Sequence, residues 1–155
     1  MILSQSTEYA LRIAAFLALN MERGPFRARE VASEAHIPVH YSSKILRKLV
    51  TAKILRSTKG HGGGFEIAQA PSKIRFIDVF KAMEGEIEPK RCVFGWDACS
   101  NKSPCILHFR WKELNEVFQD WARKTTLADV MKDVHSRGSF SFFRDVLRLD
   151  GEDCS

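Results

Sequence analysis

The sequence predicts a mainly α-helical fold with one small β-hairpin. Apolar residues recur at spacings of three and four, the period of an amphipathic helix, over most of the chain. Two short strand-like runs, residues 54–58 and 65–68, flank a glycine-rich segment and are typical of a hairpin. The length of 155 residues predicts one domain, or one small domain with an appendage. A composition of 45% hydrophobic and 28% charged residues is ordinary for a soluble globular protein.

The charge distribution indicates an anionic partner. The formal net charge is +5, and residues 23–60 carry nine basic side chains against two acidic ones, Glu30 and Glu34. The longest apolar run, Ile13 to Leu19, is much shorter than the ~18 residues that a membrane span requires. We therefore expect a cytoplasmic protein without a membrane partner.

Three predicted helices fill the first third of the chain. The first covers residues 6–20, and Gly24-Pro25 ends it with a turn. A short helix over 27–35 has alanines on its inner face, so another helix can approach closely. Pro38 breaks this helix and suits the start of the next one, over 39–52. A short helix, a tight turn and a longer helix with a basic, hydroxyl-bearing outer face form the helix-turn-helix pattern.

The hairpin that follows is typical of the wing of a winged helix-turn-helix. Its tip, residues 59–64, contains glycines that permit positive backbone dihedrals and a close approach to a partner. A nucleotide-binding P-loop is disfavoured, because Lys59 precedes the glycines and a P-loop lysine follows them. We therefore predict that the outer face of the 39–52 helix and the hairpin bind double-stranded DNA. The candidate DNA-binding residues are His40, Tyr41, Ser42, Ser43, Lys44, Arg47, Lys48, Arg56, Lys59, Gly60, His61 and Gly62.

The second half of the chain supplies a predicted loop and a long helix. A helix over 75–84 stops at Gly85, and a polar, irregular segment, 86–104, follows it. The next predicted helix, 105–123, has an apolar face with two tryptophans and a phenylalanine, more than a compact winged helix would cover. This face predicts a helix that crosses to a second subunit, and the alternative is a core helix of the monomer.

The C-terminal residues permit two interpretations. Thr125 or Thr126 can cap a further short helix that extends to Val134. Beyond Gly138, the run SFSFFRDVLRL fits either an amphipathic helix or a poorly ordered tail. The predicted domain organisation is a winged helix-turn-helix over 1–85, a cluster-binding loop over 86–104, a dimerisation helix and the following short helix over 105–134, and a tail over 135–155.

Three of the four cysteines and one histidine form the pattern C-x6-C-x5-C-x2-H, at Cys92, Cys99, Cys105 and His108. Structural zinc sites pair their ligands more tightly, whereas the ligands of an iron–sulfur cluster stand several ångströms apart, so the spacing favours a cluster. His108 follows Cys105 by three residues, hence on the same helix face, and can complete the ligand set. Glu8 is the alternative fourth ligand, and cysteines that serve only as small hydrophobes are the alternative to a metal site.

With these motifs the chain resembles the Rrf-type family of winged-helix regulators that includes IscR, NsrR and RirA. The likeness runs from MILSQSTEYALR through the wing motif KGHGGGF and the three-cysteine loop, and from CILHFRW to TTLADV. It implies a homodimeric bacterial transcription regulator, whose long helix forms the dimer interface and whose iron–sulfur cluster tunes DNA binding. It also implies Cys92, Cys99 and Cys105 as cluster ligands, with His108 as the fourth in the IscR branch and Glu8 at the acidic position of the NsrR branch.

Two features depart from the family pattern. The gap between Cys92 and Cys99 is six residues, where IscR has five, and this bears on the cluster type. Lys59 stands where the family often has arginine, and lysine neutralises a phosphate but cannot form a bidentate fork. We expect a [2Fe-2S] cluster rather than a [4Fe-4S] cluster, and a pseudo-palindromic operator.

The predicted function is a DNA-binding regulator, a repressor or an activator, whose operator affinity responds to iron, redox state or nitric oxide through its cluster. The alternative is a cluster-free regulator of the same fold that senses thiol oxidation, zinc or a metabolite. An enzyme is disfavoured, since the sequence has no C-x-x-C motif and no nucleotide-binding fingerprint.

Overall fold

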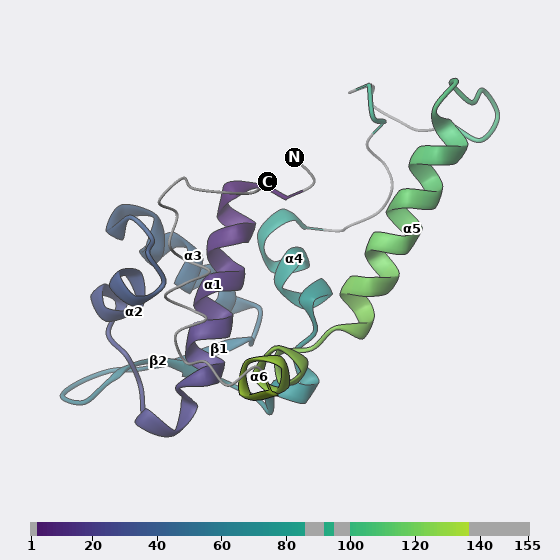
Figure 1. The fold of residues 1–155 in the computed structure, drawn as a ribbon. Helices are drawn as coiled ribbons and strands as arrows, with labels where there is room; N and C mark the ends of the chain where they lie inside the picture. Colours follow the sequence, from purple (N-terminus) through teal and green to yellow (C-terminus); the bar gives the residue numbers. More distant parts are fainter. Residues whose placement is uncertain (1–2, 86–91, 95–99, 137–155) are drawn as a thin grey trace, which may run out of the picture.

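The computed structural model describes residues 3–85, 92–94 and 100–136, and confirms the predicted fold (Figure 1). Within these residues the helices occur in the predicted order, with a single two-stranded antiparallel sheet between the third and fourth. Short 3-10 turns occur at Met21–Arg23 and Pro71–Lys73. The elements are α1 (Gln5–Leu19), α2 (Ala28–Glu34), α3 (Val39–Thr51), β1 (Leu55–Thr58), β2 (Gly64–Ile67), α4 (Phe76–Glu84), α5 (His108–Lys124) and α6 (Leu127–Ser136).

Helix α1 lies at the centre of the protein, with α2 and α3 on one side and α4 on the other (Figure 1). Its residues Ala10, Ile13 and Ala14 have no exposed surface, and Leu17 is only 1% exposed. Alanines at positions 10, 14 and 18 lie one turn apart, so they allow neighbouring helices to approach α1 closely. The main core therefore forms around α1.

The helix-turn-helix is closed by a Schellman motif at the end of α2. His36 adopts a left-handed φ of 50°, its N–H bonds to Ser33 O, and the N–H of Ile37 bonds to Ala32 O at 2.8 Å. Ile37 is 5% exposed, so the turn is anchored to the core by an apolar side chain. The predicted break is therefore confirmed: α2 ends at Glu34, and Pro38 precedes the first residue of α3.

The hairpin is attached to the helices through Phe26. Its backbone N–H and carbonyl exchange hydrogen bonds of 3.0 and 2.8 Å with Phe65 of β2. A Cβ on Gly64 would lie 2.4 Å from Phe26 O, so only glycine permits this approach. The glycine-rich motif thus serves the packing of the hairpin as well as its turn.

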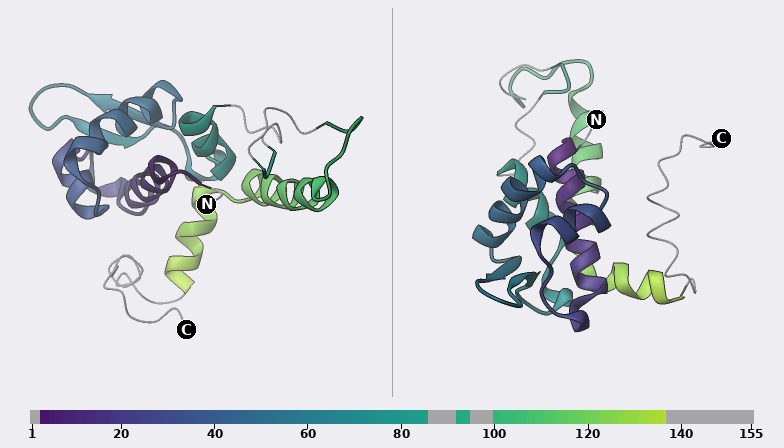
Figure 2. Two further views of the ribbon diagram at one scale, coloured as in Figure 1. Left: turned by 90° about the horizontal axis from the view of Figure 1, so that it is seen from above. Right: turned by 90° about the vertical axis from the view of Figure 1, so that its left-hand side faces the viewer.

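Helix α5 stands beside the main body and contacts it through α4 (Figure 2). Phe118 stacks on Phe80 with ring centroids 5.4 Å apart, Trp121 meets Phe76 edge-on, and Ala122 is fully buried. The prediction that the helix begins at Cys105 is wrong. The segment before His108 forms a turn in which Cys105 O accepts from the N–H of His108, and the helical ladder starts with the bond from Trp111 N to Leu107 O.

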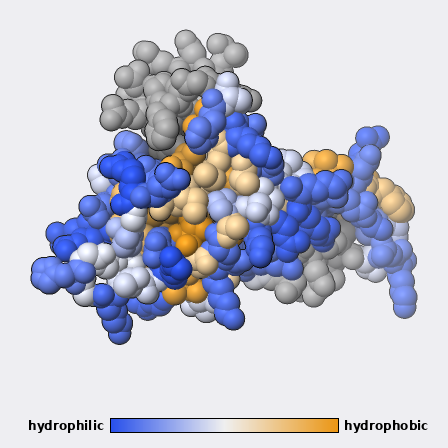
Figure 3. Space-filling model, turned by 90° about the horizontal axis from the view of Figure 1, so that it is seen from below, coloured by the Kyte–Doolittle hydropathy of each residue, from blue (hydrophilic) through white to orange (hydrophobic). Residues whose placement is uncertain are grey.

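The apolar residues of α5 are only partly covered. Leu114, Val117 and Trp121, spaced three and four apart, are 48%, 64% and 45% exposed. A second apolar strip crosses the face on which α6 lies, with hydrophilic side chains on both sides of it (Figure 3). Among the described residues, no helix is long and apolar enough to span a membrane. The two interpretations of the C-terminal run concern residues 139–149, which lie outside the described part of the chain.

The C-terminus of α3 repeats the Schellman motif with Lys53, whose φ of 59° is unfavourable for an L-residue. We expect Lys53→Gly to raise the free energy of unfolding by about 1 kcal/mol, because glycine adopts this conformation without strain. Chemical denaturation of both proteins measures the difference.

Ala52→Gly is the matched control. Ala52 precedes Lys53 and has a helical φ of −77°, so glycine there should lower the free energy of unfolding by about 0.5 to 1 kcal/mol. A loss of stability in both variants would contradict the assignment of strain to Lys53.

Candidate functional site

One face of α3 presents exposed polar and basic side chains. His40, Ser43, Lys44 and Arg47 are exposed, and Tyr41 is 42% exposed. The ring of Tyr41 is held between His40, at a centroid distance of 4.4 Å, and Tyr9 of α1, at 5.9 Å. The structure therefore brings together five of the seven predicted candidates on this helix.

Of the other two candidates on α3, Ser42 corrects the prediction and Lys48 has a partner within the protein. Ser42 is fully buried, and its hydroxyl donates to the carbonyl oxygen of Val39 at 2.7 Å, because position 42 faces α1 and the turn rather than solvent. Lys48 is half-buried, and its Nζ donates to Met83 O in α4 at 3.0 Å. Ser42 therefore belongs to the packing of the helix, whereas Lys48, one turn after Lys44, stays a predicted DNA contact whose ammonium already has a partner in α4.

The tip of the hairpin is exposed beside this face. Lys59, Gly60, His61 and Gly62 are all exposed, and the two glycines have φ values of 95° and 75°. Arg56 is partly neutralised, because its Nε donates to Glu66 across the sheet at 2.9 Å. The cationic tip therefore depends mainly on Lys59.

A hollow of about 330 Å³ separates α3 from the hairpin. Its lining includes the apolar Val50 and Phe65 and the polar Ser43, Arg47 and Ser57. Hydroxyl and guanidinium groups are common donors to a nucleic-acid backbone. Helix α3 and the hairpin thus both supply hydrogen-bond donors to the hollow between them.

The cysteine loop is only partly described. Cys92 is 6% exposed, Cys105 is half-buried, and both have free thiols, whereas Cys99 lies outside the described residues. His108 is 3% exposed, and its Nε2 lies 2.9 Å from Asn101 Oδ1. Within the described ranges, no three Cys, His, Asp or Glu side chains converge on one point. Two thiols and an imidazole are nonetheless present in this part of the chain, and this donor chemistry suits iron or zinc.

The spacing predicted that His108 and Cys105 share one helix face, and this prediction is wrong. Because Cys105 lies in the turn before α5, the two residues are joined by the 3.0 Å backbone bond of that turn. Glu8, the alternative ligand, is half-buried in the first turn of α1.

A polar junction lies beside Glu8. The Glu84 carboxylate, at the end of α4, accepts hydrogen bonds from the hydroxyls of Ser4 and Thr7, at the start of α1. These bonds hold the pKa of Glu84 below its ordinary value; burial opposes them, and the charge of Lys48 adds to them. We call Ser4, Thr7, Lys48 and Glu84 the α4 junction.

Sequence reasoning missed the α4 junction. The one available signal was Ser4, which precedes the first apolar run and caps α1 by accepting from Thr7 N. The contact of Ser4 with Glu84 joins residues eighty positions apart, and no local pattern encodes that separation.

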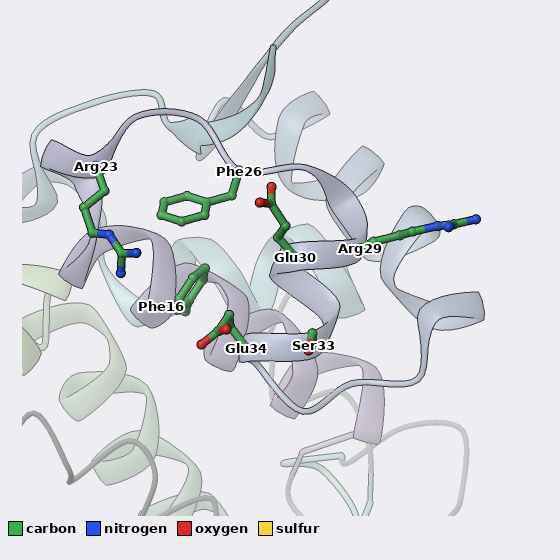
Figure 4. Close-up of a pocket in the computed structure, with 7 residues that line it drawn as sticks. All are labelled: Phe16, Arg23, Phe26, Arg29, Glu30, Ser33 and Glu34. Atoms are coloured by element: carbon green, nitrogen blue, oxygen red, sulfur yellow. The ribbon is translucent and has the colours of Figure 1, made fainter. Parts of the chain in front are cut away.

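A second hollow, of about 370 Å³, lies between α1 and α2 (Figure 4). Phe16 and Phe26 form its apolar wall, with their rings meeting edge-on at 5.1 Å, and the guanidinium of Arg23 lies over Phe26. Glu30 and Glu34 point toward this space, whereas Arg29 points away (Figure 4). Glu30 is already engaged, since its carboxylate accepts from the N–H of Arg27 at 2.6 Å.

The comparisons with known proteins agree with this geometry. The model of the Rrf2 family, described as iron-dependent transcriptional regulators, matches residues 3–133. A putative HTH-type transcriptional regulator of Aquifex aeolicus is 33% identical over 133 residues, covering 84% of this chain and 92% of the relative. The IscR regulator of Vibrio campbellii is 25% identical, covering 86% of this chain and 79% of the relative.

Two solved structures share the fold. T. potens IscR has a TM-score of 0.73 and 20% identity, covering 88% of this chain and 90% of its own. CymR of B. subtilis, described as the global cysteine regulator, has a TM-score of 0.71 and 23% identity, covering 84% and 95%. The relatives are transcriptional regulators, so the prediction of a regulator rather than an enzyme is confirmed.

The lowered pKa of Glu84 predicts a pH-dependent contribution to stability. Since the folded-state pKa lies below the ordinary value of about 4.5, the contribution is fully present above that pH. It is lost as the pH falls through the folded-state pKa. Glu84→Gln should therefore lower the midpoint of thermal unfolding at pH 7, and the difference from the wild type should shrink progressively below pH 4.5.

Glu22→Gln, at an exposed carboxylate of the Met21–Arg23 turn, is the control and should leave the midpoint of thermal unfolding nearly unchanged at pH 7 and below pH 4.5. Thermal unfolding followed by circular dichroism at several pH values gives the comparison. A Glu84→Gln difference that grows toward low pH would contradict the assigned direction.

Proposed function

Because the chain belongs to the Rrf2 family of iron-dependent transcriptional regulators, we propose that it is a homodimer that binds a pseudo-palindromic operator through α3 and the hairpin. The observation that carries the proposal is the exposed basic face of α3 beside the cationic hairpin tip. A helix of this kind enters a major groove, and a wing contacts the flanking backbone or minor groove. The contact residues are His40, Tyr41, Ser43, Lys44, Arg47, Lys59, Gly60, His61 and Gly62, with Arg56 in competition with its Glu66 partner.

The exposed stripe of α5 supports the dimer. Leu114, Val117 and Trp121 form a contiguous apolar row along one side of a helix that stands beside the body. Burying such a row against its copy contributes about 25 cal/mol for each Å² of apolar surface. A two-fold dimer also matches the symmetry of a pseudo-palindromic operator.

We further propose that Cys92, Cys99 and Cys105 hold an iron–sulfur cluster, with His108 as the fourth ligand and Glu8 as the alternative. When bound, a cluster supplies a centre that iron limitation, oxygen or nitric oxide can remove or damage. Cys92 and His108 are both buried, so ligands at these positions would be protected from bulk solvent. Asn101 fixes the His108 ring, as the outer hydrogen-bond partner of a ligand does. The protein acts in the cytoplasm, where bacterial DNA is found.

The second candidate is a cluster-free regulator that senses thiol oxidation, zinc or a metabolite. The likeness in fold to CymR, described as a global cysteine regulator, supports it. The hollow between Phe16, Phe26 and Arg23 would be the place for a metabolite. The metal content of the purified protein separates the two candidates.

The DNA interface predicts a salt-dependent effect for Lys44→Met. Operator affinity should fall, and the slope of log K against log salt should decrease by about 0.9 for each lysine that contacts a phosphate. Fluorescence anisotropy with a duplex selected by the wild type from a random-sequence pool measures both quantities. Lys112→Met on α5 makes the same charge change away from α3 and should leave affinity and slope unchanged. Equal slopes for the wild type and Lys44→Met would exclude a phosphate contact by Lys44.

The cluster predicts a metal content and its loss on mutation. Protein purified without oxygen should show visible charge-transfer bands and about two iron and two sulfide per subunit. Cys92→Ala, Cys99→Ala and Cys105→Ala should each lose the iron, and Cys154→Ala is the control that retains it. His108→Ala should shift the visible spectrum, whereas Glu8→Gln should not.

Other outcomes change the assignment. About four iron per subunit, with a spectrum sensitive to Glu8→Gln, would favour a [4Fe-4S] cluster and Glu8. Colourless, iron-free protein would leave only the second candidate.

A further inference from the structure

Lys48 is the point at which α3 is fastened to α4. Its Nζ donates to the carbonyl oxygen of Met83 at 3.0 Å, and its charge lies close enough to Glu84 to influence that carboxylate. Met83 is 8% exposed and belongs to the main core. A charged donor that bonds one of the last carbonyls of a helix also interacts favourably with the negative end of the helix dipole. Lys48 therefore fixes the spacing between the candidate DNA-reading helix and the end of α4.

The same end of α4 is fastened to the start of α1. Ser4 and Thr7 both donate hydroxyl hydrogen bonds to Glu84, and Thr7 is fully buried. Charge-assisted bonds of this kind are about twice as strong as neutral ones. Helices α1 and α3 thus both bond to the end of α4, at Glu84 and Met83.

The position of the α4 junction in the chain gives it a role. Gly85 ends α4 with a φ of 82°, and the segment from residue 86 leads directly to Cys92. On the other side, Glu8, the alternative ligand, follows Thr7 in the first turn of α1. The start of the segment that leads to Cys92 and the first turn of α1, which carries Glu8, therefore both adjoin the junction, and Lys48 ties α3 to it.

We propose that the α4 junction transmits the state of the cysteine loop to α3, and that Lys48 is a positioning residue rather than a DNA contact. A shift of the end of α4 pulls on Lys48 and turns α3 relative to the hairpin. This inference rests on the proposed function and adds the route by which the sensor reaches the DNA-reading helix.

The experiment compares operator affinity in two states. The full-length dimer is prepared without oxygen, with its cluster and after removal of the cluster by a chelator. Anisotropy with the duplex selected by the wild type gives a Kd for each state, and the ratio of the two values is the coupling. Allosteric coupling is typically about 5- to 150-fold. Lys48→Met and Glu84→Gln should each bring the ratio close to 1, and the double variant should change it no further.

Three controls separate positioning from binding and from misfolding. Lys48→Arg retains a donor for Met83 O and should restore the wild-type ratio. Lys44→Met should weaken binding in both states and keep the ratio, whereas Lys48→Met should leave the salt slope at the wild-type value. Iron content and circular dichroism establish that each variant is folded and loaded.

The outcomes distinguish this inference from the proposed function. A wild-type ratio well above or below 1 that persists in both Lys48→Met and Glu84→Gln would overturn the junction as the route and leave the regulator intact. A salt slope lowered in Lys48→Met as in Lys44→Met would make Lys48 a phosphate contact. A wild-type ratio of 1 would overturn cluster control itself, and the inference with it.

Discussion

The burial of α1 is the constraint on which the rest of the structure depends. This helix packs against α2, α3, α4, α6 and β2, so it must be apolar on several sides and small where its neighbours approach. Ile13 and Leu17 are buried to within 1% of their surface, and burying such a side chain contributes about 1.5 to 3 kcal/mol. Alanines at positions 10, 14 and 18 bring the neighbouring backbones close. Helices α2 and α3, and α4, which leads toward the cysteine loop, therefore pack on one shared support.

That support places the two parts of the candidate DNA surface. Helix α3 is fixed by its buried stripe of Ile45, Leu46 and Leu49, which faces α1. The hairpin reaches the same support through Phe26, whose ring packs edge-on against Phe16 of α1 and whose backbone bonds to Phe65. The distance between helix and wing is thus set by core packing, and the exposed side chains between them are available to a ligand.

The second half of the chain, in contrast, leaves much of its apolar surface exposed. Helix α5 is joined to the body mainly by aromatic contacts with α4, and it leaves Leu114, Val117 and Trp121 substantially exposed. An incomplete apolar surface of this kind needs a partner, as the proposed dimer provides. Helix α4 therefore has three structural roles. It packs in the core, it holds α5 beside the body, and the chain continues from it toward the cysteine loop.

The sequence by itself determined the kinds and order of the elements, since hydrophobic period, glycine and proline act locally. It also identified the exposed basic face around Lys44 and Arg47 and the cysteine pattern, because these depend on spacing along the chain. Only the tertiary structure decided which way each polar side chain faces. Ser42 lies three and four positions before Ile45 and Leu46, within the buried stripe of α3, whereas Lys48 lies beside that stripe and reaches α4, a contact that spacing along the chain does not encode. The α4 junction, the Phe26 bridge and the late start of α5 depend on contacts between distant segments or on the packing of a turn, and local pattern does not contain that information.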